Sequence, residues 1–192
     1  MGHAGMAAAA VRYLRAGPVE PLPRPELRCV REDERAPVDP GEFRRVLGSF
    51  ASGVTVVTAP TPEGPAGFAC QSFSSLSLEP PLVAFMVGRT STTWPRIARA
   101  GVFCVNVLSA RQAPLCRAFA ASGTDKFAGV DHDPAPVSGA PRLAGALAWI
   151  DCAIHAVHTG GDHLVVVGRV NALGTGESAD EPPLLFHRGR FL

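Results

Sequence analysis

The stretch Leu147–Ala172, LAWIDCAIHAVHTGGDHLVVVGRVNA, carries the strongest structural signal in the chain. Two runs rich in β-branched and other apolar residues, Leu147–His158 and His163–Ala172, flank the four residues TGGD. Paired glycines adopt the backbone angles that a tight hairpin turn requires. The stretch therefore predicts a β-hairpin made of two long antiparallel strands.

Shorter runs of similar composition are bounded by Gly, Pro or Ser, which is typical of strands. Turns, rather than regularly spaced helices, connect most of these runs. This pattern favours an antiparallel barrel with a few helices over a doubly wound parallel sheet. We expect strands at Val54–Ala59, Ala66–Ser72, Leu82–Val87, Val102–Leu108 and Leu184–His187.

Three helices are indicated by their capping residues. Asp39–Glu42, DPGE, forms a capping box with proline at the first helical position, and this helix is expected to end at Gly53. A second helix should occupy about Thr93–Gly101. Ser109–Gln112 forms another capping box and should open a third helix.

The composition excludes several classes of function. The 192 residues carry a formal net charge of +1 without basic blocks, so nucleic acid is not an expected partner. No apolar run approaches the roughly 18 residues that span a membrane. The cysteines are odd in number and form no CxxC pair. They are interpreted as reduced core or pocket thiols of a cytoplasmic protein: Cys29, Cys70, Cys104, Cys116 and Cys152.

The N-terminal part of the chain differs from the rest. Residues 1–38 are rich in Ala, Pro and Arg, and their prolines exclude a long helix there. We expect a partly flexible N-terminal extension at 1–38, followed by one domain at 39–192.

Two segments combine short hydroxyl side chains with groups that bind anions. Ala69–Ser77, ACQSFSSLS, could bind phosphate or ribityl oxygens with its serines and backbone N–H groups, or be a polar loop of Ser-based turns. Arg89–Trp94, RTSTTW, places hydroxyls and a guanidinium at a helix start, where dipole and charge favour an anion. A plain helix N-cap is the alternative there.

Three further segments carry charged or polar groups in turns. Asp125–Gly129, DKFAG, could close over a ligand or form a solvated turn. At Gly161–His163 the glycine permits a close backbone approach, and the histidine could orient a carboxamide or phosphate or simply lie on the surface. His187–Arg190 brings two fixed cations near the C-terminus.

A metal site is not expected. Cys152, His155, His158 and His163 fall within twelve residues. Side chains alternate along a strand, so Cys152 and His158 should face one side of the sheet and His155 the other. That alternation does not favour a shared site. A hydrolase is also disfavoured, because the chain has no GxSxG motif.

Taken together, these segments resemble the flavin reductase family with the FMN-binding split-barrel fold. The resemblance covers about Phe43–Leu192 and implies a mainly β, Greek-key split β-barrel with a few flanking helices. It rests on the order and spacing of Phe50–Thr58 (FASGVTVVT), Ser72–Val83 (SFSSLSLEPPLV), Phe103–Leu108 (FCVNVL), Phe119–Ala120, Asp125–Phe127 (DKF), Gly161–His163 (GDH) and Arg188–Gly189.

The resemblance implies an NAD(P)H:flavin oxidoreductase that transfers a hydride from NADH or NADPH to an exchangeable FAD or FMN. The reduced flavin would pass to a separate flavin-dependent monooxygenase in a biosynthetic or aromatic-hydroxylation pathway. A homodimer with the flavin in a groove near the subunit interface is also implied. Two alternatives remain, a split-barrel protein that stores or senses flavin without turnover and a split-barrel flavin-dependent oxidase.

The resemblance also implies residue roles. Ser91 and Thr92 would meet the phosphate end of the flavin, with Lys126 and Phe127 closing nearby, and His163 and Arg188 would lie on the nicotinamide side. His163 would act as the catalytic residue that orients the nicotinamide. The family usually has Thr-Ala-Asn where this chain has Ala69-Cys70-Gln71, which removes a hydroxyl and lengthens an amide. The isoalloxazine and ribityl chain would lie against Ser52, Gly53, Val54, Ala69, Cys70, Gln71, Ser72, Ser74 and Ser75.

Overall fold

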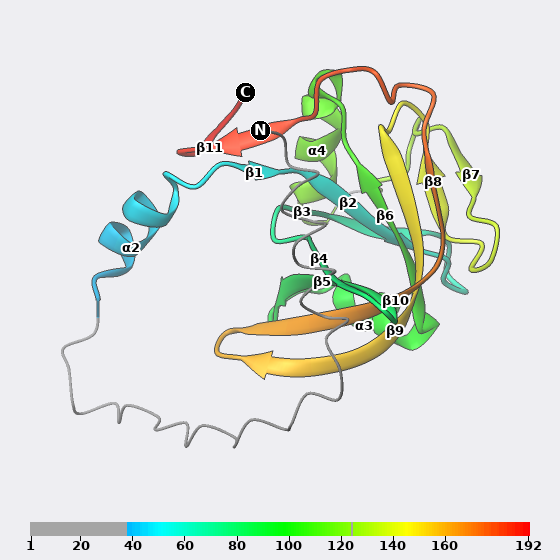
Figure 1. Ribbon diagram of the computed structural model, residues 1–192, viewed down its shortest axis with the longest axis horizontal. Helices are drawn as coiled ribbons and strands as arrows, with labels where there is room; N and C mark the ends of the chain where they lie inside the picture. Colours follow the sequence, from blue (N-terminus) through cyan, green and yellow to red (C-terminus); the bar gives the residue numbers. More distant parts are fainter. Residues whose placement is uncertain (1–37, 124) are drawn as a thin grey trace, which may run out of the picture. The chain divides into compact units, whose positions relative to one another are not determined.

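The computed structural model describes residues 38–123 and 125–192. Within them the chain is mostly β, and its main sheet has seven antiparallel strands in the order β3-β2-β6-β9-β10-β5-β4 (Figure 1). Three α-helices flank the strands: α2 (Pro40–Leu47), α3 (Trp94–Ala100) and α4 (Ala113–Ala120). The strands of the main sheet are β2 (Thr55–Ala59), β3 (Ala66–Cys70), β4 (Ser74–Leu78), β5 (Pro81–Gly88), β6 (Val102–Val107), β9 (Ala148–Gly160) and β10 (His163–Thr175).

Two smaller sheets complete the described fold. One has the order β1-β11-β12 and the other pairs β7 with β8. A short 3-10 helix, η1 (Ala110–Gln112), leads into α4. The remaining strands are β1 (Ser52–Gly53), β7 (His132–Pro134), β8 (Pro141–Leu143), β11 (Leu185–His187) and β12 (Arg190–Phe191).

The predicted long hairpin is confirmed as β9 and β10. Gly160 pairs with His163, so Gly161 and Asp162 form a two-residue turn in which Gly161 has a φ of 68°. Val167 pairs with Ala156 and Gly168 with Ile154, which leaves His155 as an extra residue in a β-bulge. A bulge bends its strand and increases the local twist. The simple alternation expected for Cys152, His155 and His158 is therefore wrong beyond this bulge.

The main sheet curls until β3, at one end, approaches β5, the strand next to the other end, without pairing with it. No ladder joins β3 to β5 within the described residues, and contacts to Met86 from the Cys70 thiol and from the hydroxyl of Ser72, just after β3, cross the gap instead. The Ser72 hydroxyl accepts a hydrogen bond from Met86 N at 2.9 Å and donates one to Met86 O at 3.0 Å. We call this gap the seam. An incompletely closed sheet of this kind is what the predicted split barrel requires, and the fold class is confirmed.

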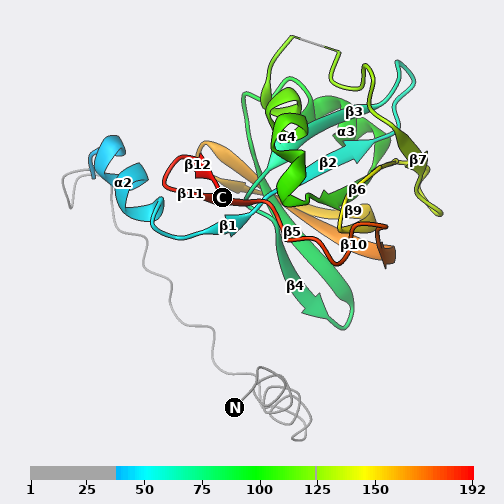
Figure 2. The same cartoon turned by 90° about the horizontal axis from the view of Figure 1, so that it is seen from above.

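The core fills the space inside the curled sheet and under α4. Inside the sheet, Phe85 contacts both Phe103 and Trp94 edge to face, and the two phenylalanines are fully buried. A second cluster includes Val56 and Phe119 and lies between β2, β3 and α4. Figure 2 shows α4 lying over these strands.

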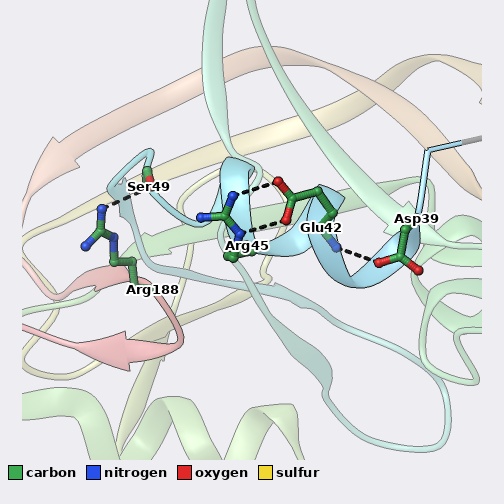
Figure 3. Close-up of polar contacts among 5 residues, drawn as sticks. All are labelled: Asp39, Glu42, Arg45, Ser49 and Arg188. Atoms are coloured by element: carbon green, nitrogen blue, oxygen red, sulfur yellow. Dashed lines mark hydrogen bonds and ion pairs between the residues drawn. The ribbon is translucent and has the colours of Figure 1, made fainter.

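Some local predictions differ from the structure. Helix α2 ends at Leu47 with Gly48 as its C-cap, so the predicted end at Gly53 is wrong. Gly48 N–H bonds back to Arg44 O, and the chain then turns into β1. Only half of the first capping box forms, because Glu42 pairs with Arg45 instead of reaching back to the cap (Figure 3).

The cap predictions for the other two helices are confirmed. Helix α3 begins after Thr93 and ends at Gly101, and the Ser109–Gln112 capping box is complete. Cys70, Cys104, Cys116 and Cys152 are buried thiols without a disulfide, as predicted. Cys29 and the predicted extension, apart from Val38, lie outside the described residues. No helix among those residues is long and apolar enough to cross a membrane.

Candidate functional site

A cavity of about 1000 Å³ lies between β3, the start of α3 and the loop after α4. We call it the α3 cavity. It brings together residues predicted at the phosphate end and the closing loop, although they come from three separate parts of the sequence. The predicted residues in its wall are Ala69, Ser91, Thr92, Lys126 and Phe127. Thr90, from the segment predicted to bind an anion, also lines it, whereas Arg96 and Phe119 were not predicted as site residues.

Lys126 is held at the cavity wall by main-chain carbonyls. Its Nζ donates to Phe119 O at 2.8 Å and to Gly67 O at 3.3 Å. Partial burial lowers the pKa of the Lys126 ammonium from its ordinary value. An ammonium has three protons, so one remains available to a ligand. Phe127 packs edge to face on Phe119 with ring centroids 5.0 Å apart, which fixes this loop against the barrel.

Ser91 serves both roles considered for its segment, a helix cap and a donor at an anion site. Its Oγ accepts a hydrogen bond from Trp94 N at 3.1 Å, which is the plain helix-cap contact. A hydroxyl that accepts still has its own proton to donate. Ser91 also lines the α3 cavity, as does Thr92. The segment therefore caps the helix and presents donors to the cavity at the same time.

The second half of the serine-rich segment, from Ser74, is an edge strand instead of a loop. Ser74 and Ser75 lie on β4, which pairs with β5, and both are exposed. The Ser74 hydroxyl bonds to Ser75 O at 3.0 Å. The Ser72 hydroxyl bonds across the seam to Met86.

Cys70 turns its side chain into the main core. It is 5% exposed, its Sγ lies 3.3 Å from the Ser72 Oγ, and burial raises the pKa of its thiol. Cys70 O accepts a bond from the Thr55 hydroxyl at 2.8 Å. The Cys70 side chain thus lies in the core and lines neither of the two cavities described here. Any contribution of this residue to flavin binding would come from its backbone.

A second cavity, of about 870 Å³, lies between α2, β1 and the turn joining β11 to β12. We call it the α2 cavity. Three residues predicted to bind flavin or nicotinamide, Ser52, Gln71 and Arg188, line it. Gly53 is exposed next to it on β1, and Val54 is buried in the second core cluster. Residues that sequence reasoning did not single out in this wall are Phe43, Arg44, Phe50 and Phe186.

Arg188 fastens the β11–β12 turn to the end of α2. Its N–H bonds to Gly48 O at 2.9 Å, and its Nη2 reaches the Ser49 Oγ at 3.4 Å (Figure 3). Its φ is 48°, in the left-handed region that a side chain with a Cβ rarely adopts. This backbone conformation directs the end of the turn toward α2.

His163 lies elsewhere, at the tip of the long hairpin. Its Nδ1 is 2.8 Å from the Asp162 Oδ1, and this hydrogen bond lowers the pKa of the Asp162 carboxyl. Asp162 O accepts from Arg89 N at 3.0 Å, which ties the tip to the loop before α3. His163 lines neither of the two cavities described here. The structure therefore does not bring His163 and Arg188 into one pocket of a single chain.

The described residues contain no group of three or more His, Cys, Asp or Glu side chains that could hold a metal ion. The two cavities fit an organic anion in the chemistry of their walls. One presents hydroxyls and an ammonium, and the other presents guanidinium groups beside phenyl rings. A Cβ built on Gly53 would meet nothing within 4 Å, so the backbone there is open to a flat ligand.

Comparisons with known proteins identify relatives of the chain. The flavin reductase like domain family matches residues 47–192. A flavin-dependent monooxygenase reductase subunit from Rhodococcus jostii is 51% identical over 154 residues, covering 80% of this chain and 77% of the relative. A flavin reductase from Pseudomonas putida is 47% identical over 165 residues, covering 85% of this chain and 95% of the relative.

Solved structures agree with these relatives. The NADH:FAD oxidoreductase of Streptomyces globisporus, solved with NAD and FAD fragments, is 40% identical with a TM-score of 0.74 and covers 82% of this chain and 96% of its own. Curated relatives include an NADH-dependent FAD reductase and an NADH-dependent FMN reductase. The predicted oxidoreductase activity and the predicted flavin and nicotinamide cofactors are confirmed. The chain belongs to the flavin reductase family.

Proposed function

We propose that this flavin reductase uses a nicotinamide dinucleotide to reduce a free flavin, which it then releases to a separate flavin-dependent monooxygenase. The α3 cavity carries this proposal, because donors from the β5–α3 loop and the loop after α4 converge there with β3. Relatives named as monooxygenase reductase subunits support release to a partner enzyme.

The protein has to bind and orient two flat rings. When bound, the flavin accepts a hydride at N5 from the nicotinamide C4, so the ligands supply the redox chemistry. Hydride transfer requires the rings to lie face to face at about 3–3.5 Å. Gly53 leaves room for a ring to approach the backbone, while Ser91 and Lys126 present protons to the phosphate end. No side-chain acid or base is needed.

His163 is proposed to orient the nicotinamide through Nε2. Its Nδ1 contacts Asp162, and this pairing fixes the ring's tautomer and angle when the Nδ1 carries the proton. Nε2 then acts as an acceptor, suited to the N–H of a carboxamide. The hairpin tip must lie against the bound nicotinamide for this role.

A homodimer is proposed because several apolar side chains are exposed on the elements around the α2 cavity. Phe43, Val46 and Leu47 on α2 are more than half exposed, and Phe50 is 81% exposed. No residue of α2 is buried in the described chain. Burying this apolar stripe against a second copy would stabilise the helix. A second copy could also bring its hairpin tip, with His163, to a shared groove.

A cytoplasmic location is proposed from the thiols. Burial raises the pKa of both Cys104 and Cys152 to about 12, and none of the four described cysteines forms a disulfide. Reduced, buried thiols fit a reducing compartment.

Steady-state turnover tests the proposal. With excess FMN or FAD, the purified chain should oxidise many equivalents of NADH while the flavin remains in solution. Dialysis should remove any bound flavin. Oxidation of a single equivalent would favour a storage or sensing protein, and a stoichiometric flavin that survives dialysis would favour a resident-cofactor oxidase.

A further inference from the structure

The β7–β8 hairpin lies outside both cavities but follows directly after the loop that carries Lys126 and Phe127. All three residues of β7 are exposed, and neither strand contributes a residue to the wall of the α2 or the α3 cavity. Ligand contact therefore does not account for this hairpin. Its attachment to the barrel is nevertheless made by side chains that are fully buried.

Asn106 fixes the second strand of the hairpin. It is fully buried on β6, and its Oδ1 accepts a hydrogen bond from Leu143 N at 2.8 Å. Its Nδ2 donates to Pro141 O at 3.2 Å, and the buried Thr58 hydroxyl donates to the same oxygen at 2.6 Å. Buried polar groups that lose their partners are costly, so these bonds hold β8 in one position.

Asp151 fixes the turn of the hairpin. It is fully buried on β9, and its Oδ2 accepts hydrogen bonds from Val137 N at 2.9 Å and Ser138 N at 3.1 Å. Its other oxygen, Oδ1, is buried without a partner among the described residues. Burying such a group opposes folding, so what the fold gains from Asp151 is the fixed position of the turn. The hairpin is thus attached to the barrel at its turn and along β8.

His132 connects this fixed hairpin to the loop before it. His132 on β7 pairs with Leu143, the residue whose N–H binds Asn106. Its ring meets Phe127 edge to face, with ring centroids 5.6 Å apart. Phe127 also lies edge to face on Phe119, so its ring has an aromatic neighbour in the barrel and another on the hairpin.

We propose that His132 is a positioning residue for flavin binding, which holds the loop 125–130 at the α3 cavity through its contact with Phe127. The inference rests on the proposed function, because it requires Lys126 to meet the flavin phosphate. Without the His132 ring, Phe127 loses one of its two aromatic neighbours. Lys126 then occupies its binding position for a smaller fraction of the time, and the apparent affinity falls by that fraction.

The test compares two flavins in His132→Ala, a substitution of an exposed side chain. The Kd for FMN should rise about three- to fivefold, within the range of one edge-to-face aromatic pair. The Kd for riboflavin, which has no phosphate, should rise less than twofold. His132→Phe should restore FMN affinity, because it keeps a ring against Phe127. At saturating FMN, kcat should equal that of the wild type.

Asp133→Ala is the matched control, since it removes the next exposed side chain on the same strand. It should leave both Kd values unchanged. A double variant measures the route of the effect. If His132 acts through Lys126, His132→Ala combined with Lys126→Gln should bind FMN no more weakly than Lys126→Gln alone.

Equal losses for both flavins, additive losses in the double variant, or no rescue by His132→Phe would overturn the positioning role. Fluorescence titration of flavin needs no NADH, so this result is independent of turnover. A protein that shows the selective FMN loss but oxidises no NADH would support the role of His132 and refute the proposed function.

Discussion

At the scale of single residues, Lys126 both holds the loop after α4 in place and offers a positive charge to an anionic ligand. Two of its protons bind main-chain oxygens, of Gly67 and Phe119, which leaves the third for a ligand in the α3 cavity that Lys126 lines. Replacing Lys126 by Gln should raise the Kd for FMN about tenfold, because a hydrogen bond to a charged group contributes roughly 1.5–3 kcal/mol. The Kd for riboflavin, which has no phosphate, should rise less than twofold. Fluorescence titration of both flavins measures the difference, and equal losses would indicate that Lys126 only holds the loop.

His163 gives the second residue-scale prediction. His163→Ala should lower kcat/KM for NADH about three- to tenfold, the effect of losing one neutral hydrogen bond. The flavin Kd should change much less. The alternative is that the His163 ring only supports the loop that carries Thr90 and Ser91, because the hairpin tip is hydrogen-bonded to that loop. A parallel loss of flavin affinity in a folded variant would assign His163 to that loop and not to the nicotinamide.

At the scale of elements, two glycines on different strands should respond in opposite ways to the same change. A Cβ on Gly168 of β10 would collide with the Phe103 ring and lie 3.2 Å from the Val83 Cγ2 in the buried core. Overpacking of this kind costs about 1–3 kcal/mol. Gly168→Ala should therefore lower Tm by roughly 2–10 °C for a domain of this size.

Gly53→Ala on β1 is the contrasting variant. Its Cβ would meet nothing within 4 Å, so thermal unfolding should be unchanged or slightly improved. Flavin affinity should nevertheless fall, because the new methyl group occupies the space predicted for the isoalloxazine. Differential scanning calorimetry and flavin titration on the same sample separate the two effects. Normal flavin binding by Gly53→Ala would remove β1 from the site.

The elements also show how far local sequence reasoning reaches. The β9–β10 hairpin and the ends of α3 were predictable, because glycines and capping residues act on their immediate neighbours. Strand β4 was not, since its serines have no buried face and it is a strand only through pairing with β5. The His155 bulge was hidden for the same reason, because it depends on the register with the next strand.

The candidate site shows the same limit. The resemblance placed Ser91 and Lys126 at the phosphate end of the flavin and Ala69 against its ring and ribityl chain, and all three line one cavity in the structure. The separation of His163 from Arg188 could not be anticipated. Their positions depend on how the long hairpin and the β1-β11-β12 sheet are placed, and no local pattern in the sequence encodes that.

At the scale of the whole molecule, the prediction is a homodimer. An exposed apolar stripe on α2 and the exposed edge strand β4, with Leu78 87% exposed, are surfaces that a second copy could bury. Sedimentation velocity at micromolar concentration should give about twice the mass of one chain. A monomer that still turns over would refute the shared groove, whereas a dimer without activity would leave assembly and catalysis as separate properties.

The weak polar contacts at the seam have a consequence for the release of product. The Ser72 side chain, just after β3, makes the shortest polar contacts to Met86 on β5, and its two hydrogen bonds contribute only about 0.5–1.5 kcal/mol each. Contacts as weak as these allow local opening at the seam while the buried core stays packed. We expect the amide of Met86 to exchange with solvent deuterium faster in Ser72→Ala, with the β9–β10 amides unaffected. An enzyme that releases its product in every cycle can thus open locally at the seam without unfolding its core.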